Sequence, residues 1–128
     1  MVKGFADWIR KEHTAAWFFV FVYASLIFYL SSIQKLPEPI KAKNVDVSYH
    51  VIEYGILGFL LFVAMRRTKQ IPRSYVLPLA VVFAALYGLS DELHQLFVPG
   101  RLCNIKDMLS DFLGSGIGAV LANRDIKI

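Results

Sequence analysis

The sequence has little of what disulfide-stabilised domains and common soluble enzymes use. Its single cysteine, Cys103, cannot form an internal disulfide. It has no Gly-x-Ser-x-Gly nucleophile motif and no glycine-rich phosphate loop. Residues 14–34 contain no Asp, Glu, Lys, Arg or His, a run longer than the apolar region of a signal peptide and with no small-x-small cleavage site after it. We therefore interpret this run as a membrane-spanning helix that is not cleaved.

The composition predicts one integral membrane domain over residues 1–128. Hydrophobic residues make up 56% of the chain and the mean hydropathy is +0.50, whereas soluble domains are about 45–50% apolar. A chain this short leaves much of its surface uncovered, so lipid must cover the surplus. The net charge of +4 comes from basic residues between apolar runs, which indicates contact with anionic headgroups rather than nucleic acid.

Hydrophobic runs predict an all-α bundle of four transmembrane helices, each near the roughly 20 residues that cross a bilayer. The predicted spans are residues 14–34, 47–65, 74–97 and 105–123. Before the first span, Phe5, Trp8 and Ile9 alternate with charged residues. That pattern fits a short N-terminal helix lying in the membrane interface.

The fourth span is the least hydrophobic of the set and is rich in small residues. These recur at every fourth position, at Ser110, Gly114, Gly118 and Ala122. The spacing lets a neighbouring helix approach closely, so we expect the fourth helix to pack inside the bundle or to be covered in a homo-oligomer. An interfacial hairpin that does not cross the membrane is the alternative.

The distribution of Lys and Arg predicts the orientation of the spans. The N-terminal segment, the loop after the second span and the C-terminal segment together have nine basic residues, and the other two loops have five. Positive residues favour the cytoplasmic side, so both termini are predicted to be cytoplasmic. The end of the first and third spans and the start of the second and fourth then share the outer face.

Ionisable and polar residues gather at these outer ends. On three spans they recur at three- or four-residue spacing, which places them on one helix face. A charged side chain inside a span costs about 2.5–3.5 kcal/mol on insertion scales, so the repetition favours a functional site over the alternative, an ordinary wet rim. The residues are His50, Glu53, Asp91, Glu92, His94, Gln95, Asp107 and Asp111.

Three stretches resemble a known family. The first span ends in FYLSSIQKLPEP, the second begins SYHVIEYGILGFLL, and residues 88–119 read GLSDELHQLFVPGRLCNIKDMLSDFLGSGIGA. They are similar to the VanZ-like family, whose pattern has His-x-x-x-Tyr in the second span, then Asp-Glu-x-x-Gln, Pro-Gly-Arg, Asp and Gly-x-x-x-Gly. The sequence departs from the pattern at Asp111, where Asn is common, and at Cys103, where Ser is common.

The resemblance implies a multi-pass protein of the bacterial plasma membrane. The founding member of the family is linked to low-level resistance to teicoplanin, a glycopeptide that binds peptidoglycan precursors. We therefore expect the outer-face residues to bind or modify an anionic lipid of the cell envelope. Membrane lipids or a lipid-linked peptidoglycan precursor are the expected partners, no cofactor is assigned, and whether the protein is an enzyme is left open.

The predicted substrate-binding residues centre on an arginine. Arg101 would hold a phosphate or carboxylate with its planar guanidinium group. Gly100 would let the backbone come close to the ligand. The resemblance adds Gln95, Glu53 and Asp107 to this set.

Catalytic, metal-binding and structural roles are predicted as alternatives. In an enzyme, Asp91 or Glu92 would be the general base and His50 or His94 the general acid. A metal site would use carboxylate–imidazole pairs at three-residue spacing on two helices; its ligands would be His50, Glu53, Asp91 and His94. A non-catalytic scaffold would use glycines as helix contacts, namely Gly55, Gly58, Gly114 and Gly118.

Overall fold

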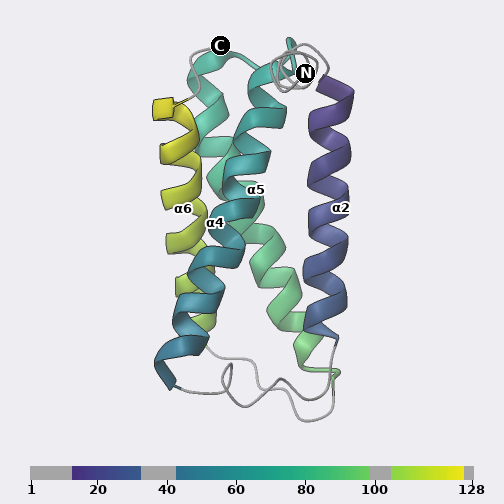
Figure 1. Cartoon of the computed structure of the whole chain (residues 1–128), viewed down its shortest axis with the longest axis vertical. Coiled ribbons are helices and arrows are strands. Elements are labelled where there is room, and N and C mark those ends of the chain that lie inside the picture. Colours follow the sequence, from purple (N-terminus) through teal and green to yellow (C-terminus); the bar gives the residue numbers. More distant parts are fainter. Residues whose placement is uncertain (1–12, 33–42, 99–104, 126–128) are drawn as a thin grey trace, which may run out of the picture.

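The computed structural model describes residues 13–32, 43–98 and 105–125 of the chain. These residues form the helices α2 (His13–Ser31), α4 (Lys43–Arg67), α5 (Arg73–Gln95) and α6 (Ile105–Asp125) (Figure 1). The described part of the chain contains no strand, so the predicted all-α bundle is confirmed. The predicted N-terminal interfacial helix falls on residues that lie outside this description.

The helix boundaries lie within a few residues of the predicted spans. α4 is longer than predicted because it begins at Lys43 and ends at Arg67, whereas hydrophobicity marks only its apolar part. α5 is shorter and ends at Gln95. The backbone N–H groups of residues 96–98 bond to carbonyl groups three residues earlier. Such bonds satisfy carbonyls that the end of a helix leaves without partners.

Three of the described helices are long and apolar enough to cross a membrane, over Thr14–Ser31, Ser48–Arg67 and Arg73–Gln95. α6 is not among them, although it runs beside α4 (Figure 1). The mean hydropathy of α6 is lowered by the small and polar side chains on its buried face. Its exposed face, by contrast, is mostly apolar. The large apolar residues exposed on α6 are Ile105, Leu109, Phe112, Leu113, Ile117, Val120 and Leu121. This two-sided character suits a helix between lipid and a polar interior.

The four described helices run alternately up and down, with α4 between α2 and α6 (Figure 1). α4 packs against the other three, most extensively against α6. At one end of the bundle, Trp17 Nε1 donates a 2.9 Å hydrogen bond to Thr68 Oγ1, which ties the start of α2 to the end of α4. The opposite end therefore contains the end of α2, the start of α4, the end of α5 and the start of α6.

Glycines form the closest helix contact, between α4 and α6. A Cβ atom placed on Gly118 would lie against the carbonyl group of Gly55, nearer than real Cβ atoms approach. One placed on Gly58 would meet the backbone of Ser115, and one placed on Gly114 would meet the backbone of α4. The predicted role of these glycines in helix packing is confirmed. Their close approach fixes which side chains of α6 face α4.

Large apolar side chains cover the outer surface of α2 and α5. Phe18, Phe21 and Tyr29 of α2 are more than half exposed, as are Phe83 and Leu86 of α5. Soluble monomers rarely expose apolar patches of more than a few hundred Å². The bundle is therefore that of a membrane protein whose apolar exterior faces lipid.

Candidate functional site in the buried polar end of the bundle

Along α5, the buried face changes from apolar to polar residues, and the site begins at this change. That face is formed by residues about four apart, which lie above one another on a helix. Its members in chain order are Val76, Ala80, Ala84, Gly88, Asp91, Glu92 and Gln95. A face that packs through small apolar side chains therefore becomes acidic in its last turns without leaving the interior of the bundle.

α4 and α6 present polar side chains at the same end. We call the whole group the polar cluster; its members are His50, Glu53, Tyr54, Asp91, Glu92, Asp107 and Asp111. Each of them is at most 8% exposed. The polar faces of the three helices thus meet inside the bundle rather than forming a wet rim, while the binding and catalytic roles of these residues stay predictions.

His50 joins the α4 and α6 parts of the polar cluster. Its Nδ1 lies 2.8 Å from Oδ1 of Asp111, a hydrogen-bond distance. Its Nε2 lies 3.8 Å from Oδ1 of Asp107, which is too long for a hydrogen bond between these two atoms. One ligand atom from each of His50, Glu92 and Asp107 can be chosen so that all lie within 4.8 Å of one another. The imidazole therefore has one nitrogen bonded to Asp111 and the other 3.8 Å from a carboxylate oxygen of Asp107.

Tyr54 links α4 to α5 through a second carboxylate. Its hydroxyl donates a 3.2 Å hydrogen bond to Oδ2 of Asp91, and its side chain is fully buried. Tyr54 is not among the residues predicted from the sequence. The signal for it was its position four residues after His50, on the same face of the helix, in the His-x-x-x-Tyr pattern.

His94 and Gln95 contact α2 at the end of α5. His94 Nε2 lies 3.0 Å from Oγ of Ser32, and the His94 ring stacks on Phe28 with the ring centroids 4.5 Å apart. Gln95 Nε2 donates a 3.2 Å hydrogen bond to Oγ of Ser31. These contacts hold the ends of the two helices together, so His94 has a packing role in the structure beside its predicted chemical one.

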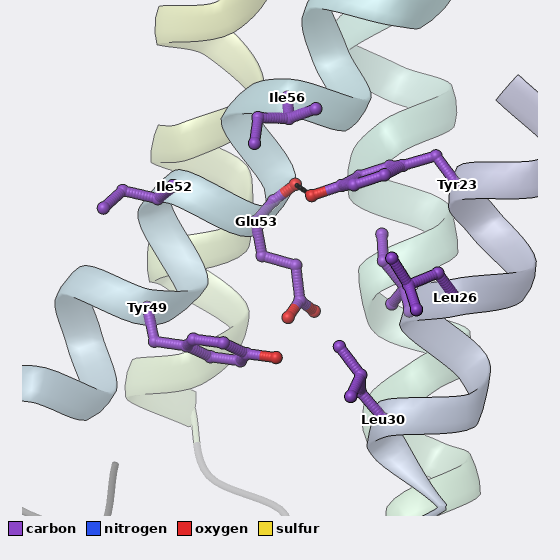
Figure 2. A pocket seen from close by; sticks show the side chains of 8 residues that line it. Tyr23, Leu26, Leu30, Tyr49, Ile52, Glu53 and Ile56 are labelled. Carbon is purple, nitrogen blue, oxygen red and sulfur yellow. Dashed lines mark hydrogen bonds between the residues drawn. The ribbon is translucent and has the colours of Figure 1, made fainter. Parts of the chain in front are cut away.

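An apolar pocket of about 220 Å³ lies between α2 and α4, and Glu53 lines it. Figure 2 shows the Glu53 carboxylate pointing into this pocket, with the hydroxyl of Tyr49 directed toward it. Tyr23 donates a 2.8 Å hydrogen bond to the backbone carbonyl of Glu53, which fixes this turn of α4 against α2. Oε2 of Glu53 has no hydrogen-bond partner among the described residues. A buried acceptor is therefore available to a ligand that enters the pocket.

A second, larger pocket lies nearer the other end of the bundle. Its volume is about 450 Å³, and α2, α4 and α5 all contribute to its lining. Trp17 and Phe21 line it from α2, Leu61 from α4, and Phe83 and Tyr87 from α5. The lining is almost wholly apolar, so this pocket suits hydrocarbon and offers no site for polar chemistry.

The polar cluster is rich in acidic side chains. The cluster contains five carboxyl groups and one imidazole. Oδ1 of Asp91 and Oδ2 of Asp111 have no hydrogen-bond partner in the described part of the chain. Buried carboxylates are costly without compensation, so these two oxygens are positions at which a bound proton or a cation would be stabilising. Arg101 and Gly100, predicted to hold the anionic ligand, lie outside the described residues.

Comparisons with known proteins identify the family. Comparison with curated proteins and with solved structures gave no match. The VanZ/LLP1 family model matches residues 5–126. This stretch includes every residue of the polar cluster and all three stretches that resemble the VanZ-like pattern. The chain therefore belongs to the VanZ/LLP1 family, which is linked to glycopeptide resistance.

Proposed function

We propose that the protein binds or modifies an anionic lipid, or a lipid-linked precursor, of the bacterial cell envelope at the outer face of the plasma membrane. The observation that carries the proposal is the contact between a buried polar cluster and an apolar pocket, with Glu53 belonging to both. A ligand that fills both must have a polar head and an apolar chain. Envelope lipids and lipid-linked peptidoglycan precursors have this structure.

The pocket between α2 and α4 is open to the side, where lipid lies. Leu26 of α2 and Ile52 and Ile56 of α4 line it and are each about half exposed or more. Its volume of about 220 Å³ is below the roughly 300–1,000 Å³ of ordinary small-molecule pockets. It therefore suits one segment of a hydrocarbon chain, and the rest of the chain would continue along the outside of the bundle.

Sequence and family support an anionic head. Arg101 stands in the Pro-Gly-Arg motif before α6, and Lys106 lies in the first turn of α6. An arginine at this position suits phosphate or carboxylate recognition. The founding member of the family is linked to resistance to a glycopeptide that binds peptidoglycan precursors. A precursor attached to a lipid phosphate would place its chain in the pocket and its phosphate on the arginine, and it would agree with this family link.

The charge distribution supports placement of the site at the outer face. The polar cluster lies at the end of the bundle opposite Arg66 and Arg67, which end α4, and Arg73, which begins α5. Basic residues of short loops favour the cytoplasm. The cluster would then face the outer leaflet, where peptidoglycan precursors are used, and both termini would be cytoplasmic.

The geometry narrows the catalytic alternatives. His50 and Glu92 belong to one buried group, whereas His94 is engaged with Ser32 and Phe28 at the contact with α2. If the protein modifies its ligand, His50 and Glu92 are therefore the better acid–base pair. Binding without reaction uses the same residues to hold the head of the lipid.

The first test is glycopeptide susceptibility of a sensitive bacterium that expresses the protein. We expect teicoplanin tolerance to rise with the wild-type protein and to be lost with Glu92→Gln and with Arg101→Ala at equal membrane level. Ser25→Ala is the matched control, because Ser25 is exposed on α2 and its hydroxyl bonds only within its own helix at the Phe21 carbonyl. Tolerance that survives both site substitutions would contradict the proposal.

A binding measurement tests the same proposal without a phenotype. Native mass spectrometry of the purified protein would compare retention of polyprenyl phosphate with that of the uncharged polyprenol. We expect preferential retention of the phosphate, because the head must be anionic. Equal retention of the two would mean that the chain alone is recognised, and the anionic part of the proposal would fail.

A further inference from the structure

We propose that His50, Glu92 and Asp107 form a binding site for one divalent cation of the Zn²⁺ or Mn²⁺ type. The residues come from α4, α5 and α6, and each is at most 7% exposed. One ligand atom from each can be chosen so that the atoms all lie within 4.8 Å of one another. The inference deepens the proposed function, since contact between the cation and an anionic lipid head rests on that function.

The spacing of the ligand atoms fits an ion between them. Zinc bonds to nitrogen and oxygen at about 2.0–2.2 Å in tetrahedral geometry, so two of its ligand atoms lie roughly 3.3–3.6 Å apart. The 3.8 Å between His50 Nε2 and Asp107 Oδ1 is slightly wider than that spacing. All the chosen ligand atoms lie within 4.8 Å of one another, so binding would require the side chains to move inward by at most roughly 1.5 Å.

The orientation of His50 is an independent observation that points to a metal. Asp111 Oδ1 lies 2.8 Å from His50 Nδ1 and is itself almost completely buried. In metal sites the ligating histidine commonly donates its other N–H to a carboxylate, which sets the tautomer and the direction of the ring. With a proton on Nδ1, Nε2 is the nitrogen that would bind the ion, and it lies 3.8 Å from Oδ1 of Asp107.

The charge balance of the polar cluster points the same way. The polar cluster contains five buried carboxyl groups and one imidazole. Oδ1 of Asp91 and Oδ2 of Asp111 are buried acceptors without hydrogen-bond partners among the described residues. A divalent cation beside them would lower the cost of burying these two carboxylates, because buried charge is costly without compensation.

The ligand set selects the kind of cation. An imidazole suits zinc and other transition metals, and carboxylates also suit manganese, whereas calcium and magnesium prefer oxygen ligands alone. Three protein ligands leave at least one coordination position open, as in catalytic metal sites. The open position could take a phosphate oxygen of the lipid head. This would explain how an acidic cluster accepts an anionic ligand. With the cation bound, His50 and Glu92 act as its ligands and not as an acid–base pair.

The inferred ligands differ from those that spacing in the sequence suggests. His50 is common to both sets, but His94 lies at the contact with α2, and Glu53 points into the apolar pocket (Figure 2). His94→Asn is therefore a matched control: it removes an imidazole at the same end of the bundle without touching the three proposed ligands.

The test is metal binding by the full chain, purified in detergent and stripped with a chelator. Zn²⁺ or Mn²⁺ alone is added, excess metal is removed, and bound metal per chain is measured by mass spectrometry, with affinity from calorimetry. We expect about one ion per chain for the wild-type protein and for His94→Asn. Glu92→Gln and Asp107→Asn should each bind at least about tenfold more weakly, and Asp111→Ala, which removes the acceptor that orients the His50 ring, about 10–100-fold more weakly.

Two outcomes would overturn the inference. One is a wild-type protein that retains neither metal, a result that needs no variant and so does not depend on how the variants fold. The other is wild-type affinity in both Glu92→Gln and Asp107→Asn with unchanged helical circular dichroism. No lipid enters this experiment, so its failure leaves the proposed lipid function standing. A metal-loaded protein that does not retain polyprenyl phosphate would remove that function and leave the cation site in place.

Discussion

The imidazole of His50 and the carboxylate of Asp111 meet across the contact between α4 and α6, with Nδ1 and Oδ1 2.8 Å apart. The two residues lie near the glycines that bring these helices together. The polar contact depends on the close approach of the two backbones. Small residues one and two turns further along α6 allow this approach and so bring the two side chains within hydrogen-bond distance. In this bundle, helix packing therefore positions the polar site.

The contact between His50 and Asp111 predicts a graded loss of stability. Asp111→Ala removes the group bonded to Nδ1 in a buried site, which should lower the free energy of unfolding by about 1–3 kcal/mol. Asp111→Asn keeps an oxygen acceptor of the same shape and should cost less. Unfolding of the detergent-solubilised protein in mixed micelles measures both. Equal losses in the two variants would show that the hydrogen bond contributes nothing measurable.

The glycine contact predicts that one added methyl group is harmful at Gly118 and harmless at Gly116. A Cβ on Gly118 meets the backbone of α4 at Gly55, whereas a Cβ on Gly116 meets nothing within 4 Å. Backbone cannot move aside cheaply, so Gly118→Ala should cost about 1–3 kcal/mol by overpacking. Gly116→Ala should leave the midpoint of thermal unfolding unchanged or slightly raised. A stable Gly118→Ala protein would mean that α6 sits further from α4.

The hydroxyl of Tyr54 predicts a separation between stability and function. Tyr54→Phe removes the donor to Asp91 but keeps the buried ring, and should lower the free energy of unfolding by about 1–3 kcal/mol. Tyr87→Phe is the control, because that hydroxyl donates to the backbone carbonyl of Ala24. We expect both variants to lose similar stability and only Tyr54→Phe to lose teicoplanin tolerance. Parallel loss of tolerance would make Tyr54 a structural residue only.

The helices, their alternating directions and the close packing of α6 could be predicted from the sequence. The uncharged run 14–34 marks α2, and the alternating direction of successive spans places the acids of α5 and α6 at one end. Small residues four apart on α6 predict close packing, which the positions of Gly114 and Gly118 confirm. These features depend only on hydrophobicity, chain direction and side-chain volume, so one sequence suffices to predict them.

The rotation of each helix could not be predicted in the same way. His50 and Glu53 are three residues apart, which corresponds to about 60° around an α-helix of 3.6 residues per turn. Because α4 lies between α6 and α2 (Figure 1), that difference directs His50 toward Asp111 on α6 and Glu53 into the pocket beside α2. The three-residue spacing predicts that the two residues share one helix face. Which neighbour each of them contacts depends on the positions of α2 and α6, which the spacing does not give.

The pocket between α2 and α4 gives the most direct prediction about the ligand. Ile56→Trp places a larger side chain in the lining of the pocket and should exclude part of a lipid chain. Each buried CH₂ contributes about 0.8 kcal/mol, so exclusion of two should weaken binding of polyprenyl phosphate by roughly tenfold. Leu113→Trp is the matched control, because Leu113 is exposed on α6 and is not among the residues that line the pocket.

Titration of the detergent-solubilised protein with polyprenyl phosphate measures both tryptophan variants against the wild type. Weaker binding in Ile56→Trp alone would place the chain between α2 and α4, and Glu53→Gln should then also weaken binding through the head. Equal affinity in all three proteins would exclude this pocket as the chain site. Since the pocket near Trp17 and Tyr87 is larger and apolar, it would then be the next candidate site for the chain, and the head would be far from the polar cluster.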